Sequence, residues 1–143
     1  SAACIVQKRV IVFCNSNHSV KQWKYQFRTW AELFDAQGNG MYIDDKSIAE
    51  FISKSNNRRF NSIKERIFDE KPLILITTYN MMYGTNSADS KEIRKQLQSL
   101  EWGLAILDEV HVVPANTFKD AINSIKAHCK LGLTATLLRE DNK

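Results

Sequence analysis

Four short runs of apolar residues recur along the chain, and longer segments with helical spacing separate them. The runs occupy residues 10–13, 73–76, 104–107 and 131–133. Runs that are short and apolar throughout are typical of strands buried on both faces of a parallel sheet. Because strands that alternate with helices indicate βαβ units, we predict an α/β fold: a doubly wound parallel sheet with helices on both faces.

The segments between the runs predict three amphipathic helices. The first begins near Ser19, where Ser19 and Gln22 fit a capping box. The second covers residues 88–100, and the third follows Pro114, which suits a first helical turn because proline has no N–H to leave unpaired. Spacings of three and four predict inward stripes on these helices: Val20, Trp23, Phe27, Trp30 and Phe34; Ile93, Leu97 and Leu100; Phe118, Ile122 and Ile125. Residues 1–8 resemble the tail of a helix, and residues 41–43 are predicted to form a short strand.

Residues 44–71 differ in composition from the rest of the chain. They are polar and basic, and nearby carboxylates largely offset the positive charge. Scattered apolar residues suggest short surface helices: Ile48, Phe51, Ile52, Phe60, Ile63 and Ile67. We interpret the segment as a polar insertion that forms a solvated flap rather than a DNA-binding element.

Composition restricts the class of protein. The 143 residues suffice for one domain, and 43% apolar with 25% charged residues is typical of a globular protein, which argues against a disordered chain. No apolar stretch is long enough to cross a bilayer, and no segment reads as a signal peptide. Cys4, Cys14 and Cys129 form no CxxC pair, so they indicate a reducing compartment rather than a disulfide framework or a zinc site. The net charge of +4 favours polyanionic partners only weakly.

The most informative motif is the tetrad Asp108-Glu109-Val110-His111, directly after the run at 104–107. Side chains at the carboxyl end of a parallel strand face the crevice where open α/β sheets bind ligands. Two adjacent carboxylates there can hold Mg²⁺ and align a water molecule on a terminal phosphate. An aspartate at this place can also simply cap the next helix, so the motif needs support from elsewhere in the chain.

Polar residues also follow the other three runs. Asn15 and Ser16 follow the first, Thr77 and Thr78 the second, and Thr134-Ala135-Thr136 the fourth, about 25 residues after the tetrad. Hydroxyls, amides and helix N-termini at such strand ends can hold phosphates, and the hydroxyls of the fourth set can hydrogen-bond the tetrad. Each set alone is also typical of an ordinary turn, so only the order of the sets along the chain points to a nucleotide site.

In that order, these motifs resemble motifs Ia, Ib, II and III of superfamily-two helicases. Within them, the xeroderma pigmentosum group B family is the closest in pattern, through the valine of the tetrad, the sequence EWGL at 101–104, the sequence AHCKLGLTAT at 127–136 and the sequence RED at 139–141. The resemblance is weakest in residues 44–71. It implies that residues 1–143 are part of the N-terminal RecA-like lobe of an ATP-dependent DNA helicase or translocase. Such an enzyme opens duplex DNA in transcription initiation and nucleotide excision repair in the nucleus.

The resemblance also implies roles for single residues and the partners that they serve. Asp108 would bind Mg²⁺ through water, Glu109 would orient the attacking water, and His111 would link the nucleotide site to Thr134 and Thr136, or to the second lobe. The residues expected near the DNA backbone are Asn15, Ser16, Thr77 and Thr78, and those expected to couple DNA to ATP use are Arg139, Glu140 and Asp141. The implied cofactors are ATP and Mg²⁺. The implied partners are single- and double-stranded DNA, other subunits of transcription factor II H and a second RecA-like lobe, with no membrane.

One expected motif does not occur. None of the five glycines begins a Gly-x-x-x-x-Gly-Lys-Ser/Thr phosphate loop. We therefore expect an excised fragment whose phosphate-loop strand precedes Ser1, and which is inactive alone without that loop and the second lobe. Two alternatives stay open: another superfamily-two motor, such as an RNA helicase or a restriction-type translocase, and a non-catalytic interaction module.

Overall fold

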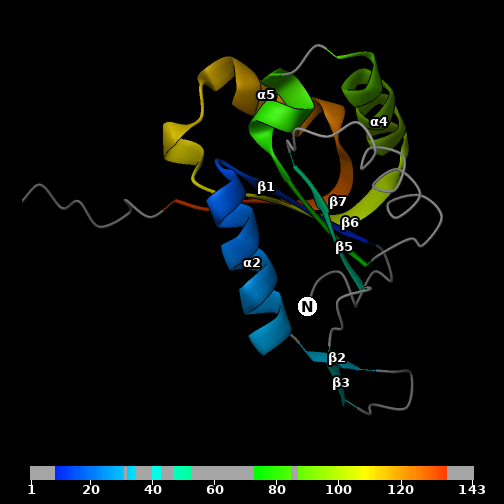
Figure 1. Cartoon of the computed structure of the whole chain (residues 1–143). Helices are drawn as coiled ribbons and strands as arrows, with labels where there is room; N and C mark the ends of the chain where they lie inside the picture. The colour runs from blue at the N-terminus through cyan, green and yellow to red at the C-terminus, as the bar shows by residue number, and fades with distance from the viewer. Residues whose placement is uncertain are drawn as a thin grey trace, which may run out of the picture.

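A five-stranded sheet forms the centre of the computed structural model, which describes residues 9–30, 32–34, 40–42, 47–52, 73–84 and 87–134 (Figure 1). The strand order is β4-β5-β1-β6-β7 and every pairing is parallel. The strands are β1 (Val10–Cys14), β4 (Ile48–Phe51), β5 (Ile74–Thr78), β6 (Glu101–Leu107) and β7 (Lys126–Gly132). The parallel sheet predicted from the apolar runs is confirmed.

Helices cover both faces of this sheet (Figure 1). Helix α2 (Asn17–Trp30) packs on one face, where Val12, Val20 and Ile106 belong to one buried cluster. Helices α4 (Ala88–Ser99) and α5 (Ala115–Ser124) pack on the other face, where the second cluster includes Leu97 and Ala121. Successive residues of β1 alternate between the two clusters, as the period of a strand requires. The predicted doubly wound arrangement is confirmed.

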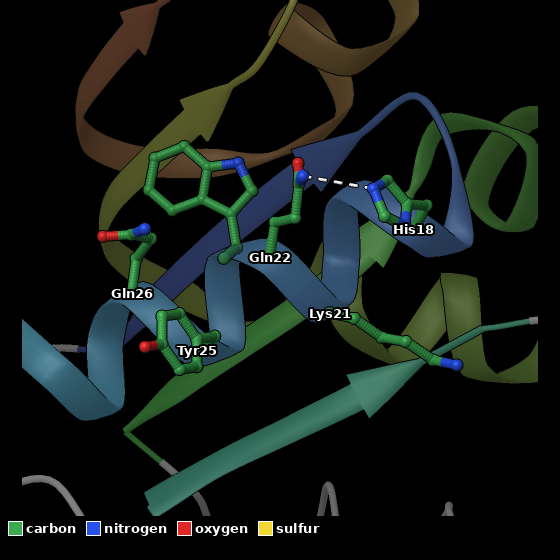
Figure 2. A pocket seen from close by; sticks show the side chains of 6 residues that line it. His18, Lys21, Gln22, Tyr25 and Gln26 are labelled. Carbon is green, nitrogen blue, oxygen red and sulfur yellow. Dashed lines mark hydrogen bonds between the residues drawn. The ribbon is translucent and has the colours of Figure 1, made fainter.

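The start of α2 differs from the prediction. The helix begins at Asn17, and the hydroxyl of Ser16 accepts a hydrogen bond from the backbone N–H of Ser19 at 3.2 Å. The side chain of Gln22 lies 3.1 Å from Nε2 of His18 (Figure 2). The predicted capping box of Ser19 and Gln22 is therefore wrong, because an earlier serine supplies the cap.

The other helices agree more closely with the prediction. Helix α4 begins after Ser87, whose hydroxyl accepts the N–H of Ser90, and α5 directly follows Pro114. Helix α2 ends at Trp30, so Phe34 lies beyond it in β2 (Glu32–Phe34). Strand β2 pairs with the antiparallel β3 (Gly40–Tyr42), which confirms a strand near residues 41–43. None of the helices in the described ranges has the length and apolar character that a membrane span needs.

The first part of the predicted insertion belongs to the sheet. Ile48, Phe51 and Ile52 are buried, and β4 pairs with β5 along its length. A surface helix at these positions is therefore wrong, because their side chains complete the core beside β5. Residues 53–72, 1–8 and 135–143 lie outside the described residues, and with them the remaining predictions for the insertion and the N-terminal helix.

Candidate nucleotide site at the carboxyl edge of the sheet

The exits of β1, β6 and β7 are joined by backbone hydrogen bonds. The N–H of Asp108 donates to the carbonyl of Phe13 at 2.9 Å, which continues the β1–β6 ladder beyond its last strand residue. The N–H of Leu133 donates to the carbonyl of Leu107 at 2.8 Å, and the N–H of Val110 donates to the carbonyl of Leu133 at 3.0 Å. The tetrad therefore lies between the segments that leave the two neighbouring strands, as expected for a parallel sheet.

Asp108 is half-buried and, besides its bond to Phe13, accepts hydrogen bonds from three other residues. Its Oδ2 accepts the indole N–H of Trp23 at 2.9 Å, and its Oδ1 accepts the N–H of Glu109 at 3.0 Å. The hydroxyl of Tyr79 donates to the main-chain carbonyl of Asp108 at 2.9 Å. The carboxylate is thus fixed from helix α2 and from its own loop, while the backbone is fixed from β1 and Tyr79.

Trp23 and Tyr79 were not among the predicted site residues. Helical spacing assigned Trp23 to the core, and its ring does pack on Phe27 at 5.5 Å between centroids. Tyr79 stacks on Phe13 at 5.7 Å. The signal available in the sequence was the polar atom of each ring, because a largely buried tryptophan or tyrosine usually needs a hydrogen-bond partner.

Glu109 has a left-handed backbone, with φ 50° and ψ 46°. Among the described residues other than glycine, it alone has a positive φ. This conformation costs an L-residue roughly 1–2 kcal/mol and is found where a surrounding structure enforces it. The Asp108 carboxylate accepts the N–H groups of Glu109 and Trp23 rather than those of a helical first turn, so the aspartate cap that the sequence allowed is not formed, and the Glu109 side chain does not cap the 3₁₀ turn Val110–Val112 that follows. The strained residue instead turns the chain sharply at the strand exit.

His111 and Thr134 meet as the sequence predicts. The hydroxyl of Thr134 lies 2.9 Å from Nδ1 of His111, which joins the tetrad to the segment after β7. The other residues predicted to act with this pair lie outside the described residues: Thr136, Arg139, Glu140 and Asp141.

The four residues expected near DNA divide into two pairs. Asn15 and Ser16 are exposed at the exit of β1. Thr77 and Thr78 are 0% and 4% exposed, and the Thr77 hydroxyl donates to the carbonyl of Phe51. The Thr78 hydroxyl accepts the N–H of Met81. The structure therefore corrects the expectation that these two threonine hydroxyls are available to a DNA backbone, because β5 extends through both and turns them inward.

The carboxylates make this edge of the sheet electronegative. Burial raises the pKa of the Tyr79 hydroxyl, and the charge of Asp108 raises it further. Burial also raises the pKa of the Cys14 thiol to about 12, with Asp108 and Glu109 adding to the shift. Tyr79 therefore remains a protonated donor at neutral pH, and any ligand held here meets negative charge that a cation can balance.

The donor set suits one class of metal ion. Within the described ranges, no group of three or more histidine, cysteine, aspartate or glutamate residues could enclose a metal. Each oxygen of Asp108 accepts one hydrogen bond, and a carboxylate oxygen has a second lone pair. Mg²⁺ usually keeps several waters and takes one or two carboxylates together with substrate phosphates. The site fits such an ion and does not fit a structural zinc.

Comparison with known proteins gives consistent matches over the chain. A family model described as "Type III restriction enzyme, res subunit" matches residues 3–139. The general transcription and DNA repair factor IIH helicase/translocase subunit XPB of Dictyostelium discoideum is 45% identical over 100% of the chain and 16% of its own length. The XPB subunit of Drosophila melanogaster is 40% identical, with the same two shares. The XPB/SSL2 subunit of Saccharomyces cerevisiae is 40% identical over 100% of the chain and 15% of its own length. The chain therefore spans about a sixth of the length of these curated relatives.

Proposed function

Because the chain belongs to the family of type III restriction enzyme res subunits, we propose that it is part of a RecA-like lobe of an ATP-dependent DNA helicase or translocase. The observation that carries the proposal is the pair Asp108 and Glu109 at the carboxyl edge of a parallel sheet. One carboxylate is pinned by hydrogen bonds, and the other extends from a strained backbone. A site that fixes two adjacent carboxylates suits phosphoryl transfer, where positioning and charge do most of the work.

The two carboxylates take different parts in the proposed reaction. Asp108 would hold Mg²⁺ through water, because each of its oxygens accepts one hydrogen bond and keeps a second lone pair at a half-buried position. Glu109 orients and polarises the water that attacks the terminal phosphate of ATP. Bound Mg²⁺ supplies charge neutralisation to the phosphates.

Communication with DNA is proposed for the residues around this pair. Asn15 and Ser16 are exposed where β1 ends, and backbone-contacting residues of this kind position a protein on nucleic acid without reading its sequence. His111 and Thr134 are hydrogen-bonded partners and connect the tetrad to the segment that continues toward residues 136 and 139–141. We propose that Thr136, Arg139, Glu140 and Asp141 extend this connection to DNA and to a second lobe.

The relatives are named as helicase/translocase subunits of general transcription and DNA repair factor IIH, and these names are the basis for a proposal about the intact protein. We propose that the intact protein acts in the nucleus with other subunits of that factor and opens duplex DNA. The 143-residue chain contains no glycine-rich phosphate loop, so we expect no measurable ATP hydrolysis from the chain alone.

The test is ATP hydrolysis by the intact protein with and without duplex DNA. Glu109→Gln is expected to abolish the DNA-stimulated rate, because the amide cannot polarise water as a carboxylate does. Glu101→Gln is the matched control, since Glu101 is an exposed carboxylate at the opposite end of the same strand. Equal loss in both variants, or full activity in Glu109→Gln, would contradict the proposal.

The description of the matching family favours a second candidate, a restriction-type motor. The same lobe can serve either machine, because the fold does not determine the substrate. Duplex DNA, single-stranded DNA and RNA of equal length are compared as activators, followed by cleavage of unmethylated and methylated duplexes. Cleavage of the unmethylated but not of the methylated duplex would identify the restriction-type motor. Stimulation by RNA alone would identify an RNA helicase.

A further inference from the structure

Trp23 connects helix α2 to the carboxylate pair over 85 residues of sequence. Its indole N–H lies 2.9 Å from Oδ2 of Asp108, and the contact is partly buried. Trp23 also lines a hollow of about 680 Å³ along α2 (Figure 2), together with His18, Lys21, Gln22, Tyr25 and Gln26. Neither helix packing nor turn chemistry requires the indole N–H to point at Asp108.

The direction of that N–H is set by the packing of the ring. The rings of Trp23 and Phe27 lie 5.5 Å apart with 34° between their planes. Both side chains pack on the cluster that includes Val12 and Ile106, on the α2 face of the sheet. A half-buried ring held in this way has little freedom to turn, so its N–H remains aimed at one oxygen.

We propose that Trp23 is a positioning residue that fixes the Asp108 carboxylate for a divalent cation; this rests on the proposed function. The last side-chain torsion of an aspartate is broad, so one hydrogen bond from Glu109 does not fix both oxygens. The indole supplies the second bond. It donates only and carries no charge, so it orients the carboxylate without neutralising it or competing with the cation. Partners behind a metal ligand commonly have this role.

The experiment compares two tryptophan-to-phenylalanine variants of the intact protein. Trp23→Phe removes the N–H that faces Asp108 and keeps an aromatic ring. Trp102→Phe removes a buried indole N–H that donates to the carbonyl of Leu97, at the opposite end of β6. Each variant therefore loses one indole hydrogen bond, but only one of the two bonds lies at the carboxylate.

Cation affinity is measured without turnover. Mn²⁺ replaces Mg²⁺ because both prefer carboxylate and water ligands, and its free-ion paramagnetic resonance signal disappears on binding. With a non-hydrolysable ATP analogue present, and after subtraction of the Mn²⁺ that the analogue binds without protein, Trp23→Phe is expected to weaken Mn²⁺ binding about 10- to 100-fold. Trp102→Phe is expected to lower the melting temperature and leave Mn²⁺ affinity as in the unmodified protein. Equal affinities in both variants would overturn the role of Trp23.

Two further variants separate the possible failures. Asp108→Asn tests the proposed function: if it binds Mn²⁺ as the unmodified protein does, or the unmodified protein binds none, both proposals fail. If Asp108→Asn weakens binding and Trp23→Phe does not, only the role of Trp23 is wrong. Should Trp23→Phe be insoluble, Phe27→Leu removes the ring that supports the indole. It is then expected to weaken Mn²⁺ binding to a smaller extent, and an unchanged affinity would again overturn the inference.

Discussion

The left-handed backbone of Glu109 predicts that glycine is more stable than alanine at this position, while either substitution removes the carboxylate and the activity. At φ 50° and ψ 46°, the backbone conformation costs an L-residue roughly 1–2 kcal/mol, and glycine lacks this cost. Glycine also gains freedom in the unfolded chain, which offsets about 0.4–1 kcal/mol of that benefit. The comparison of Glu109→Gly with Glu109→Ala isolates the backbone, because neither variant retains a carboxylate. Glu109→Gly is expected to be more stable than Glu109→Ala by about 1 kcal/mol.

The assay is thermal and urea unfolding of the purified chain, followed by circular dichroism. A difference of about 1 kcal/mol corresponds to a melting temperature higher by about 3 °C in a domain of this size. The control is Lys95, an exposed residue within α4, where Lys95→Gly is expected to be less stable than Lys95→Ala by about 1 kcal/mol. If Glu109→Gly is also the less stable of its pair, Glu109 stores no backbone strain and the reasoning is refuted.

Three more predictions follow from side chains around the site. Thr134→Val in the intact protein is expected to reduce stimulation by DNA more than basal hydrolysis, because it removes the bond to His111, whereas Thr134→Ser keeps the hydroxyl and the stimulation. At pH 8, iodoacetamide is expected to modify the exposed Cys129 but not Cys14, since burial and a pKa of about 12 leave about one thiolate in 10⁴ at Cys14; mass spectrometry of native and denatured protein checks this. Tyr79→Phe is expected to cost about 1 kcal/mol of unfolding free energy at neutral pH, because the half-buried carbonyl of Asp108 loses a hydrogen-bond donor. Because the pKa of Tyr79 is raised in the folded state, its hydroxyl ionises just above pH 10 only in the unfolded state. The free energy of unfolding therefore falls as pH rises through this range. Urea unfolding should show a shallower fall in Tyr79→Phe.

The sheet could be predicted from the sequence because each of its central strands contains an uninterrupted apolar run, at residues 10–13, 73–76 and 104–107. Strand β4 could not be predicted, because it has only four residues and lies in a segment whose overall composition is polar. The helix start at Asn17 was missed because two serines three residues apart both suit a cap, and only the structure separates Ser16 from Ser19. Such errors arise where local sequence permits two solutions and tertiary packing selects one.

The candidate site was predictable to the extent that it follows from strand order. Asp108 and Glu109, and the contact of His111 with Thr134, come from residues that immediately leave neighbouring strands. Trp23 could not be assigned, because its contact spans 85 residues and its spacing also satisfies core packing. For Thr77 and Thr78, the apolar run ended two residues before the strand did, so their hydroxyls were taken for surface groups.

The ladder between β1 and β6 does not stop at the last strand residue. It continues to the bond from the Asp108 N–H to the Phe13 carbonyl, so the segment beginning at Asn15 and the acidic loop share one rigid backbone seam. Opening that seam would break hydrogen bonds between strands whose last paired residues, Phe13 and Leu107, are buried, and this costs free energy. The two loops are therefore expected to move together as one block, so a conformational change in this domain would leave the spacing between Asn15 and Asp108 unchanged.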